Sequence, residues 1–210
     1  VSGFGRPRTT DMTHPTQSLH IPDTQSERDE RHLAIQRVGV KDVRYPLRVK
    51  IGGVEQTTAA LWDLDVALPA EKKGTHMSRF VAWLDALDAP LDAALLRDKL
   101  AAMLALLNAS EGRVESRFSF FVRKRAPVSG VSSLLDYQGR WVAETRAGRT
   151  TVWSEVAVPV KTLCPCSKEI SDYGAHNQRS TVTIRVETHE AVGWEELVRY
   201  AEVNASSEIW

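Results

Sequence analysis

The residues with the clearest chemical potential lie in one stretch, KTLCPCSKEISDYGAHNQRS, which spans residues 161–180. It contains Cys164 and Cys166, the two cysteines of the chain, followed by His176. Thiolate sulfur and neutral imidazole bind zinc and other first-row divalent metals. Gly174 permits a tight reversal of the chain that would bring His176 back toward Cys164. These residue types indicate a metal site.

Spacing alone leaves a second interpretation open. A C-x-C pair followed by one distant histidine is not a known zinc-finger spacing. Cysteines are also common as small buried hydrophobes, and a lone loop histidine is more often a hydrogen-bonded polar residue. Cysteines separated by one residue do not readily form an unstrained disulfide. We therefore expect Cys164 and Cys166 to be reduced thiols, as is usual in the cytoplasm.

A third metal ligand is available near the end of the chain, where WEELVRYAEVNASSEIW predicts an amphipathic helix. At about 100° per residue, Glu195, Glu196 and Glu202 project away from its apolar stripe. Glu208 returns to that stripe if the helix continues through the two serines before it. A carboxylate on an apolar face is unfavourable unless it is paired or bound to metal. The alternative is a frayed helix end that leaves Glu208 in water.

Basic residues near these positions suit an anionic substrate. Lys168 and Arg179 flank the cysteines and the histidine, and KGTHMSRF supplies His76 and Arg79. Arginine and lysine pair strongly with phosphate oxygens, so these groups can contact a nucleotide. The alternative for each of them is a solvated surface charge.

Composition narrows the function further. The chain has 210 residues, with 27 Lys and Arg against 27 Asp and Glu. A formal net charge of zero argues against a broad nucleic-acid-binding surface. No apolar run approaches the roughly 20 residues of a membrane span, and no secretory signal opens the chain. Residues 1–32 are predicted to be a flexible lead-in. We expect a soluble cytoplasmic protein with no membrane or nucleic-acid partner.

Periodicity predicts an α+β fold. Trp62, Leu64 and Val66 alternate with polar residues in LWDLDVALP, which is typical of a strand. A Gly-Gly pair predicts a hairpin before it, and a further hairpin is expected across RAGR. Ser78 is a candidate N-cap of a first helix. The predicted strands lie in residues 33–68, 113–125, 130–163 and 180–188, and the other helices in 91–108 and 193–210. Antiparallel strands interrupted by paired helices indicate α+β architecture, with the strands–helices–strands order present twice in weak form.

LCPCSKEISDYGAHNQRS, together with KGTHMSRF, QRVGV and ASSEIW, strongly resembles the type IB GTP cyclohydrolase I family. The resemblance extends from about Ile35 to Trp210. It implies a tunnel fold, in which an antiparallel sheet carries paired helices on one face. It also implies a single catalytic unit over residues 33–210, divided approximately into modules 33–125 and 126–210. The implied reaction converts GTP and water to 7,8-dihydroneopterin triphosphate and formate, the first step of tetrahydrofolate biosynthesis.

The resemblance also implies roles for individual residues. Cys164, His176 and Glu208 match the ligands of one divalent metal ion, which can be zinc, manganese or iron(II). Cys164 is also implied to be catalytically important, and Cys166 acquires no role. His76 is our candidate for a proton shuttle or a triphosphate contact. Three further residues are candidate substrate contacts, namely Arg79, Lys168 and Arg179. The implied assembly is a homo-oligomer, a tetramer, with sites at subunit boundaries.

The sequence departs from the family at its end. Family members continue past the SSE segment to a further glutamate that anchors the guanine ring, whereas this chain stops at Trp210. We expect the stop to fall within a helix and the chain to be incomplete, because Ile209 and Trp210 offer no cap.

Two other functions remain open. One is a tunnel-fold nitrile reductase, with Cys164 or Cys166 as a covalent nucleophile and a nicotinamide cofactor. The short Glu-x-Lys-x-x-Lys cofactor motif associated with that enzyme is not evident. The other is a non-catalytic binding module in which Cys164, Cys166 and His176 hold a structural zinc ion.

Overall fold

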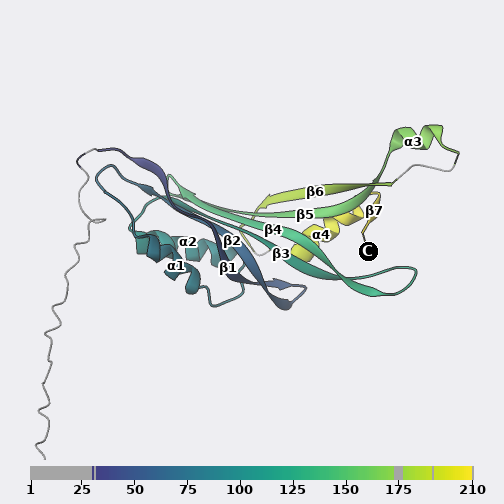
Figure 1. Ribbon diagram of the computed structural model, residues 1–210, viewed down its shortest axis with the longest axis horizontal. Coiled ribbons are helices and arrows are strands. Elements are labelled where there is room, and N and C mark those ends of the chain that lie inside the picture. Colours follow the sequence, from purple (N-terminus) through teal and green to yellow (C-terminus); the bar gives the residue numbers. More distant parts are fainter. Residues whose placement is uncertain (1–29, 31, 173–176, 191, 210) are drawn as a thin grey trace, which may run out of the picture.

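A computed structural model describes residue 30 and residues 32–172, 177–190 and 192–209. The predicted flexible lead-in therefore lies almost wholly outside the described residues. The described part is an α+β structure whose strands and helices are long and regular (Figure 1). The strands are β1 (Ile35–Ile51), β2 (Val54–Leu68), β3 (Gly112–Arg125), β4 (Ser132–Arg146), β5 (Arg149–Leu163), β6 (Asn177–Glu187) and β7 (Ser207–Glu208). The helices are α1 (Met77–Asp85), α2 (Ala93–Leu107), α3 (Pro165–Ile170) and α4 (Trp194–Val203).

All of these strands form one antiparallel sheet. Its order is β1-β2-β3-β4-β5-β6, and β7 pairs with β5 beside the end of α4. Neighbours in sequence are mostly neighbours in space, as expected for hairpin connections. The hairpin between β1 and β2 turns at Gly52 and Gly53, both with positive φ, which a two-residue hairpin turn requires. The predicted hairpin across RAGR is also confirmed, since Arg146 pairs with Arg149.

Helices α1, α2 and α4 lie on the same face of the sheet (Figure 1). Alternate residues of the strands point toward them and form a single core with their apolar sides. Trp62 and Leu64 of β2 are fully buried there, and Trp194 of α4 packs against Phe118 and Trp141. The prediction of an antiparallel sheet with helices on one face is confirmed.

The residues of opposite parity form the open face of the sheet, and this face is rich in charge. Glu115 of β3 accepts hydrogen bonds from Arg140 of β4 at 2.8 and 3.1 Å and from Arg113. Arg117 contacts Asp63 at 3.2 Å, and Arg140 also reaches Glu155 at 3.3 Å. Cross-strand pairing of opposite charges stabilises a sheet face that no helix covers.

Two helix boundaries differ from the predictions. The first helix begins at Met77 with His76 at the N-cap position, so Ser78 is inside the helix and is not its cap. For α2 the start is fixed by Asp92, whose carboxylate accepts a hydrogen bond from the backbone N–H of Leu95 at 2.8 Å. Side-chain capping therefore marks the start of α2 but not that of α1.

The last predicted helix is shorter than expected. Helix α4 ends at Val203, and the chain then turns so that Ser207 and Glu208 pair with Lys161 and Val160 of β5. The expectation that the helix would continue through the serines, and that the chain would stop within a helix, is wrong. Backbone pairing with a strand 48 residues earlier (208 minus 160) competes with helical periodicity and prevails here. No helix in the part of the chain that the structure describes has both the length and the apolar character needed to cross a membrane.

Candidate metal and substrate site

Cys164 occupies the junction between strand β5 and the short helix α3. It follows β5 directly and is the N-cap residue of α3, where Pro165 is the first helical residue. The carbonyl of Cys164 accepts the backbone N–H of Lys168 at 3.3 Å, which closes the first turn. We did not predict this helix from the sequence, although proline after a cap position is a recognised signal for a helix start.

The environment of Cys164 favours its thiolate form. The backbone N–H of Ser167 and then its hydroxyl lower the pKa of the Cys164 thiol below its ordinary value, and the same hydroxyl donates to the carbonyl of Cys164 at 3.1 Å. Cys164 is half-buried, whereas Cys166 is exposed, and both are free thiols as predicted. A thiolate is the form that binds metal, so Cys164 is chemically suited to the role that the resemblance implies.

The cationic residues around Cys164 are in place. Helix α3 projects beyond the end of the sheet (Figure 1), and Lys168 on it is exposed. Arg179 lies opposite Lys161 in the pairing of β6 with β5, and it is also exposed. His176 falls in the segment 173–176, outside the described residues. The predicted pairing of Cys164 with His176 therefore stays a prediction.

Glu208 is paired rather than solvated, but not in the way predicted. From β7 its side chain points to the same sheet face as its partner Val160, the face that α4 covers. There its Oε2 accepts a hydrogen bond from Nζ of Lys124 at 2.8 Å. The side chain of Glu208 remains 32% exposed. The polar environment of Glu208 thus comes from β3, a strand 84 residues earlier in the chain.

Lys124 links Glu208 to a more deeply buried group. Its Nζ also donates to Oε2 of Glu202, and the hydroxyl of Tyr137 donates to Oε1 of Glu202 at 2.7 Å. The side chains of Lys124 and Glu202 are only 11% and 6% exposed. Burial alone would lower the pKa of Lys124, but its hydrogen bonds to Glu202 and Glu208 outweigh this and raise it. For Tyr137, burial and then the bond to Glu202 raise the pKa of the phenol.

Glu202 was predicted to project away from the apolar stripe of the last helix, and that prediction is wrong. It stands four residues after Val198, which is buried, and i and i+4 share a helix face. Lys124 could also have been found, because it continues the alternation of the buried residues Phe118 and Phe120 on β3. A charged residue on the buried face of a strand indicates that a partner of opposite charge lies in the interior. The sequence gives no such indication for Tyr137, because tyrosine is common in strands whether or not its hydroxyl has a buried partner.

Cys164 and Glu208 are not brought within the reach of one metal ion. Four residues of β-strand separate Val160, the partner of Glu208, from Cys164, which is about 13 Å at about 3.3 Å per residue. Among the described residues, which exclude His176, no three His, Cys, Asp or Glu side chains converge closely enough to hold a metal ion. The donor types therefore fit a metal site, but the described residues do not bring them together.

His76 and Arg79 lie far from Cys164 within one chain. They stand at the start of α1, and Figure 1 places α1 and α3 at opposite ends of the sheet. Arg79 is attached to the neighbouring helix through a 3.0 Å bond from its Nη1 to the carbonyl of Leu106. The structure thus separates the predicted site residues into two groups at the two ends of the molecule.

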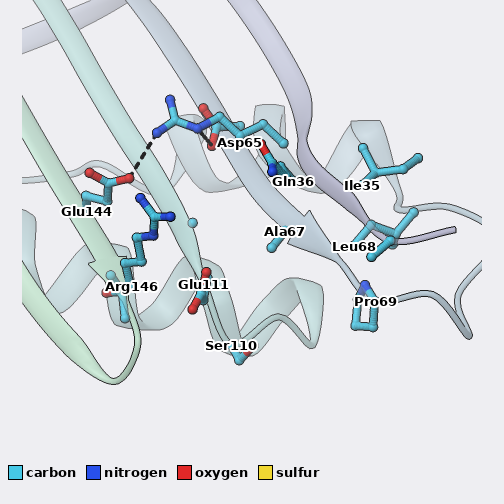
Figure 2. Close-up of a pocket in the computed structure, with 14 residues that line it drawn as sticks. Ile35, Gln36, Asp65, Ala67, Leu68, Pro69, Ser110, Glu111, Glu144 and Arg146 are labelled. Carbon is cyan, nitrogen blue, oxygen red and sulfur yellow. Dashed lines mark hydrogen bonds and ion pairs between the residues drawn. The ribbon is translucent and has the colours of Figure 1, made fainter.

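A cavity of about 460 Å³ lies at the sheet end that is remote from α3 (Figure 2). It is lined by charged groups of both signs, and Figure 2 shows Asp65, Glu144 and Arg146 on its walls. Arg37 binds Glu144 at 3.0 Å and lies 3.9 Å from Asp65. Burial raises the pKa of the Asp65 carboxyl, and the neighbouring guanidinium of Arg37 opposes this. None of the residues predicted for catalysis or metal binding lines this cavity.

The fold and the donor set define a class of protein: an α+β chain with one antiparallel sheet, bearing an activated thiol and several cations at one end. Comparison with known proteins is more specific. A family described as type I GTP cyclohydrolase folE2 matches residues 21–210. The chain belongs to this family.

Individual relatives agree. A GTP cyclohydrolase FolE2 from Methylibium petroleiphilum is 64% identical over 95% of this chain and 78% of its own length. A GTP cyclohydrolase FolE2 from Paraburkholderia xenovorans is 58% identical, over 95% of this chain and 75% of the relative. The corresponding protein from Burkholderia pseudomallei is 54% identical over 90% of this chain and 72% of the relative.

Proposed function

We propose that this chain is a GTP cyclohydrolase that converts GTP and water to 7,8-dihydroneopterin triphosphate and formate. This would be the first step of tetrahydrofolate biosynthesis, and it makes the protein a cytoplasmic hydrolase of a cyclic amidine. The observation that carries the proposal is 64% identity to a GTP cyclohydrolase FolE2 over 95% of the chain. Identity at that level over nearly the whole chain supports a shared fold and a shared reaction.

The architecture supports a tunnel fold with residues 33–210 as one catalytic unit. Two strands, two helices and two strands follow one another from β1 to β4, and then come β5, α3, β6, α4 and β7. This order is compatible with two modules, approximately 33–125 and 126–210. The modules would share one continuous sheet, because β3, β4 and β5 pair without interruption.

Cys164, His176 and Glu208 are the proposed ligands of one divalent metal ion per site. The lowered pKa of the Cys164 thiol and the carboxylate of Glu208 supply donors that suit zinc, manganese or iron(II). When bound, such an ion acts as a Lewis acid that makes hydroxide available near neutral pH. Addition of water at C8 opens the imidazole ring of the purine, and a second hydrolysis releases that carbon as formate.

The remaining polar residues have roles that their positions allow. Lys168 and Arg179 are exposed near Cys164, where they can bind the triphosphate of GTP. His76 is proposed to move a proton or to contact the triphosphate, with Arg79 beside it. His76 and Arg79 belong to the start of α1, which lies at the opposite end of the sheet from α3. They can therefore act at the Cys164 site only from a second subunit. This supports a homo-oligomer, proposed to be a tetramer, with sites at subunit boundaries.

A direct test is incubation with GTP followed by oxidation and detection of the fluorescent pterin. We expect pterin fluorescence and stoichiometric formate, both lost on chelation of the metal and restored by its return. A cysteine-dependent nitrile reductase would instead consume a nicotinamide cofactor and survive chelation. A structural zinc module would unfold on chelation and release no formate with metal bound. Either of these results would reject the proposal.

A further inference from the structure

The hairpin between β3 and β4 extends past helix α4 as an arm (Figure 1). Pairing of β3 with β2 ends at Phe118, and pairing of β4 with β5 ends at Gln138. Beyond those positions the two strands pair only with each other. We call residues 122–135 the arm, and the turn at residues 126–131 is its tip.

The arm exposes apolar side chains. Val128 at the tip is 99% exposed, and Val131 and Leu134 are 65% and 56% exposed. Single exposed apolar residues are ordinary on a protein surface, but several on one projecting hairpin are typical of a contact surface. Removing them from water against a second surface would therefore stabilise a complex.

The arm is also cationic. Residues 122–135 include three cations and no acid, and the nearest acid after them is Asp136. Lys124 is already bound to two glutamates beneath α4. Arg123 and Arg125 are exposed, and Nε of Arg125 donates to the carbonyl of Gly130 in the tip at 3.1 Å. The two α4 charges nearest Arg123, one arginine and one glutamate, offset each other. The arm thus presents apolar side chains together with two cations.

A surface that complements the arm lies at the opposite ends of the same two strands. It is the cavity of about 460 Å³ at the start of β3 and the end of β4 (Figure 2). Its apolar lining includes Leu68, Pro69 and Ile35, and Ile35 is 44% exposed. A cavity of about 150 Å³ holds benzene, so this one has room for the apolar side chains of the tip. Thirteen residues of β3 (125 minus 112) separate cavity and arm, which is about 43 Å, so the arm cannot fill the cavity of its own chain.

The charges of the cavity are opposite to those of the arm. Its charged residues are Asp65, Glu111, Glu144, Arg37 and Arg146. Arg113, which is close to Asp65, is bound by a carboxylate of its own, that of Glu115. The cavity therefore has one surplus negative charge, counted as minus three plus two. Complementary charges of this kind orient two surfaces and speed their association.

We propose that the arm of one chain docks into this cavity of a second copy of the chain, which returns the same contact. Two chains that lie antiparallel allow both contacts at once, related by a two-fold axis, the commonest symmetry of homo-oligomers. The inference rests on the proposed function for its consequence at the site. The arm and α3 lie at one end of the molecule and α1 at the other (Figure 1). The contact therefore brings Cys164 of one chain toward the end of the second chain that bears α1.

The test is Val128→Asp in the full chain, with self-association measured by sedimentation equilibrium over a range of protein concentrations. Because Val128 is almost fully exposed, the change leaves the fold of the single chain intact. A charge placed in a buried apolar contact should raise the dissociation constant of the assembly by about 30-fold or more. The matched control is Val54→Asp, at a valine that is 64% exposed on the β1–β2 hairpin, and it should change that constant by less than about twofold.

A mixing experiment tests whether arm and cavity meet each other. Ile35→Asp places a charge in the cavity and should weaken association as Val128→Asp does. A mixed dimer of the two variants keeps one intact contact, between the arm of the Ile35→Asp chain and the cavity of the Val128→Asp chain. We therefore expect the mixture to associate more tightly than either variant alone.

The outcomes separate the inference from the function on which it rests. A monomeric wild type, or equal association of Val128→Asp and Val54→Asp, would reject the contact. A mixture that associates no better than either variant would reject the pairing of arm with cavity. A monomer that binds vesicles of anionic phospholipid through Val128 would assign the arm to a membrane surface and also reject the contact. Association that depends on the arm, without formate release from GTP, would keep the contact and reject the proposed function.

Discussion

Two ionic clusters occupy opposite faces of the same sheet. On the open face, three carboxylates (Asp63, Glu115 and Glu155) meet three guanidinium groups (Arg113, Arg117 and Arg140). Beneath α4, the covered cluster consists of Lys124, Tyr137, Glu202 and Glu208.

The two clusters differ in enclosure. On the open face Asp42 also contacts Arg117, at 2.6 Å, so that four carboxylates meet three guanidinium groups, and Glu115, at 7% exposure, is contacted by three arginines. In the covered cluster one ammonium serves two carboxylates, and one of these has an oxygen without a donor among the described residues. The cavity beneath α4 is also lined by Arg123, Arg199 and Glu195, so charge balance does not separate the two clusters. Helix α4 covers one of them, whereas no helix in the described part of the chain covers the other.

The largest expected loss of stability follows from replacing Glu115 in the open-face cluster. Replacing Glu115 with Gln leaves Arg113 and Arg140 without their carboxylate, and we expect unfolding free energy to fall by about 2 kcal/mol after discounting for the partial exposure of the arginines. Metal affinity should stay within about twofold of the wild type, because metal ligation does not involve the open face. Urea unfolding at fixed protein concentration and Co²⁺ titration would measure the two quantities.

A smaller stability change together with a loss of metal affinity as large as that of Cys164→Ala would contradict this separation. It would show that the open-face network is coupled to the proposed metal site through the sheet.

The two clusters should also differ in their response to pH. Burial would raise the pKa of Glu115, but its bonds to Arg140 and Arg113 outweigh this and lower it. A lowered carboxyl pKa stabilises the fold above about pH 4.3, its unfolded value, and that contribution is lost as pH falls through the folded pKa. The stability gap between wild type and Glu115→Gln should therefore shrink, by about 0.5 kcal/mol, as the pH is taken from 6 down to 4.

For Lys124 the dependence of its stability contribution on pH has the opposite sign. Its raised pKa means that its contribution is complete below about pH 10.4, the unfolded value, and is lost only as pH rises through the folded pKa. The gap between wild type and Lys124→Met should be flat between pH 5 and 9. Unfolding curves across this range would measure it, and a gap that shrinks on acidification would place the titrating group elsewhere.

The smallest expected effect belongs to Tyr137→Phe. This change removes one hydrogen bond to Glu202 and leaves the ring in the core, so it should lower unfolding free energy by about 1 kcal/mol. Urea unfolding would measure this change. A loss of unfolding free energy as large as that of Lys124→Met would mean that the phenol, rather than the ammonium, holds the cluster together.

Much of the fold could be predicted from local pattern. Alternation located the long strands, a Gly-Gly pair located the first hairpin, and helical period located α2 within two residues at each end. Such signals are local, and the sheet follows because consecutive hairpins leave few alternatives. The ends of elements were less accessible. Helix α4 stops at Val203 because the next residues pair with β5, and a helical projection contains no information about that strand.

The site was predictable in residue type but not in arrangement. Cys164 could be chosen from its chemistry alone. The contacts with Ser167 that lower its pKa, however, depend on helix α3, which is too short to show a helical period in the sequence. Lys124 lies 84 residues from Glu208 in sequence, and only the order of strands brings them together. Polar pairs between residues so distant in sequence leave no local pattern from which they could be predicted.

The central claim is that Cys164 is a metal ligand of a GTP-hydrolysing site, and the most direct measurement compares Cys164→Ala with Cys166→Ala. Both remove one thiol, two residues apart, from the junction of β5 and α3. Bound metal and formate release from GTP should fall at least about 100-fold in Cys164→Ala and remain near wild type in Cys166→Ala. A folded Cys164→Ala protein that keeps full formate release and full metal content would contradict the account.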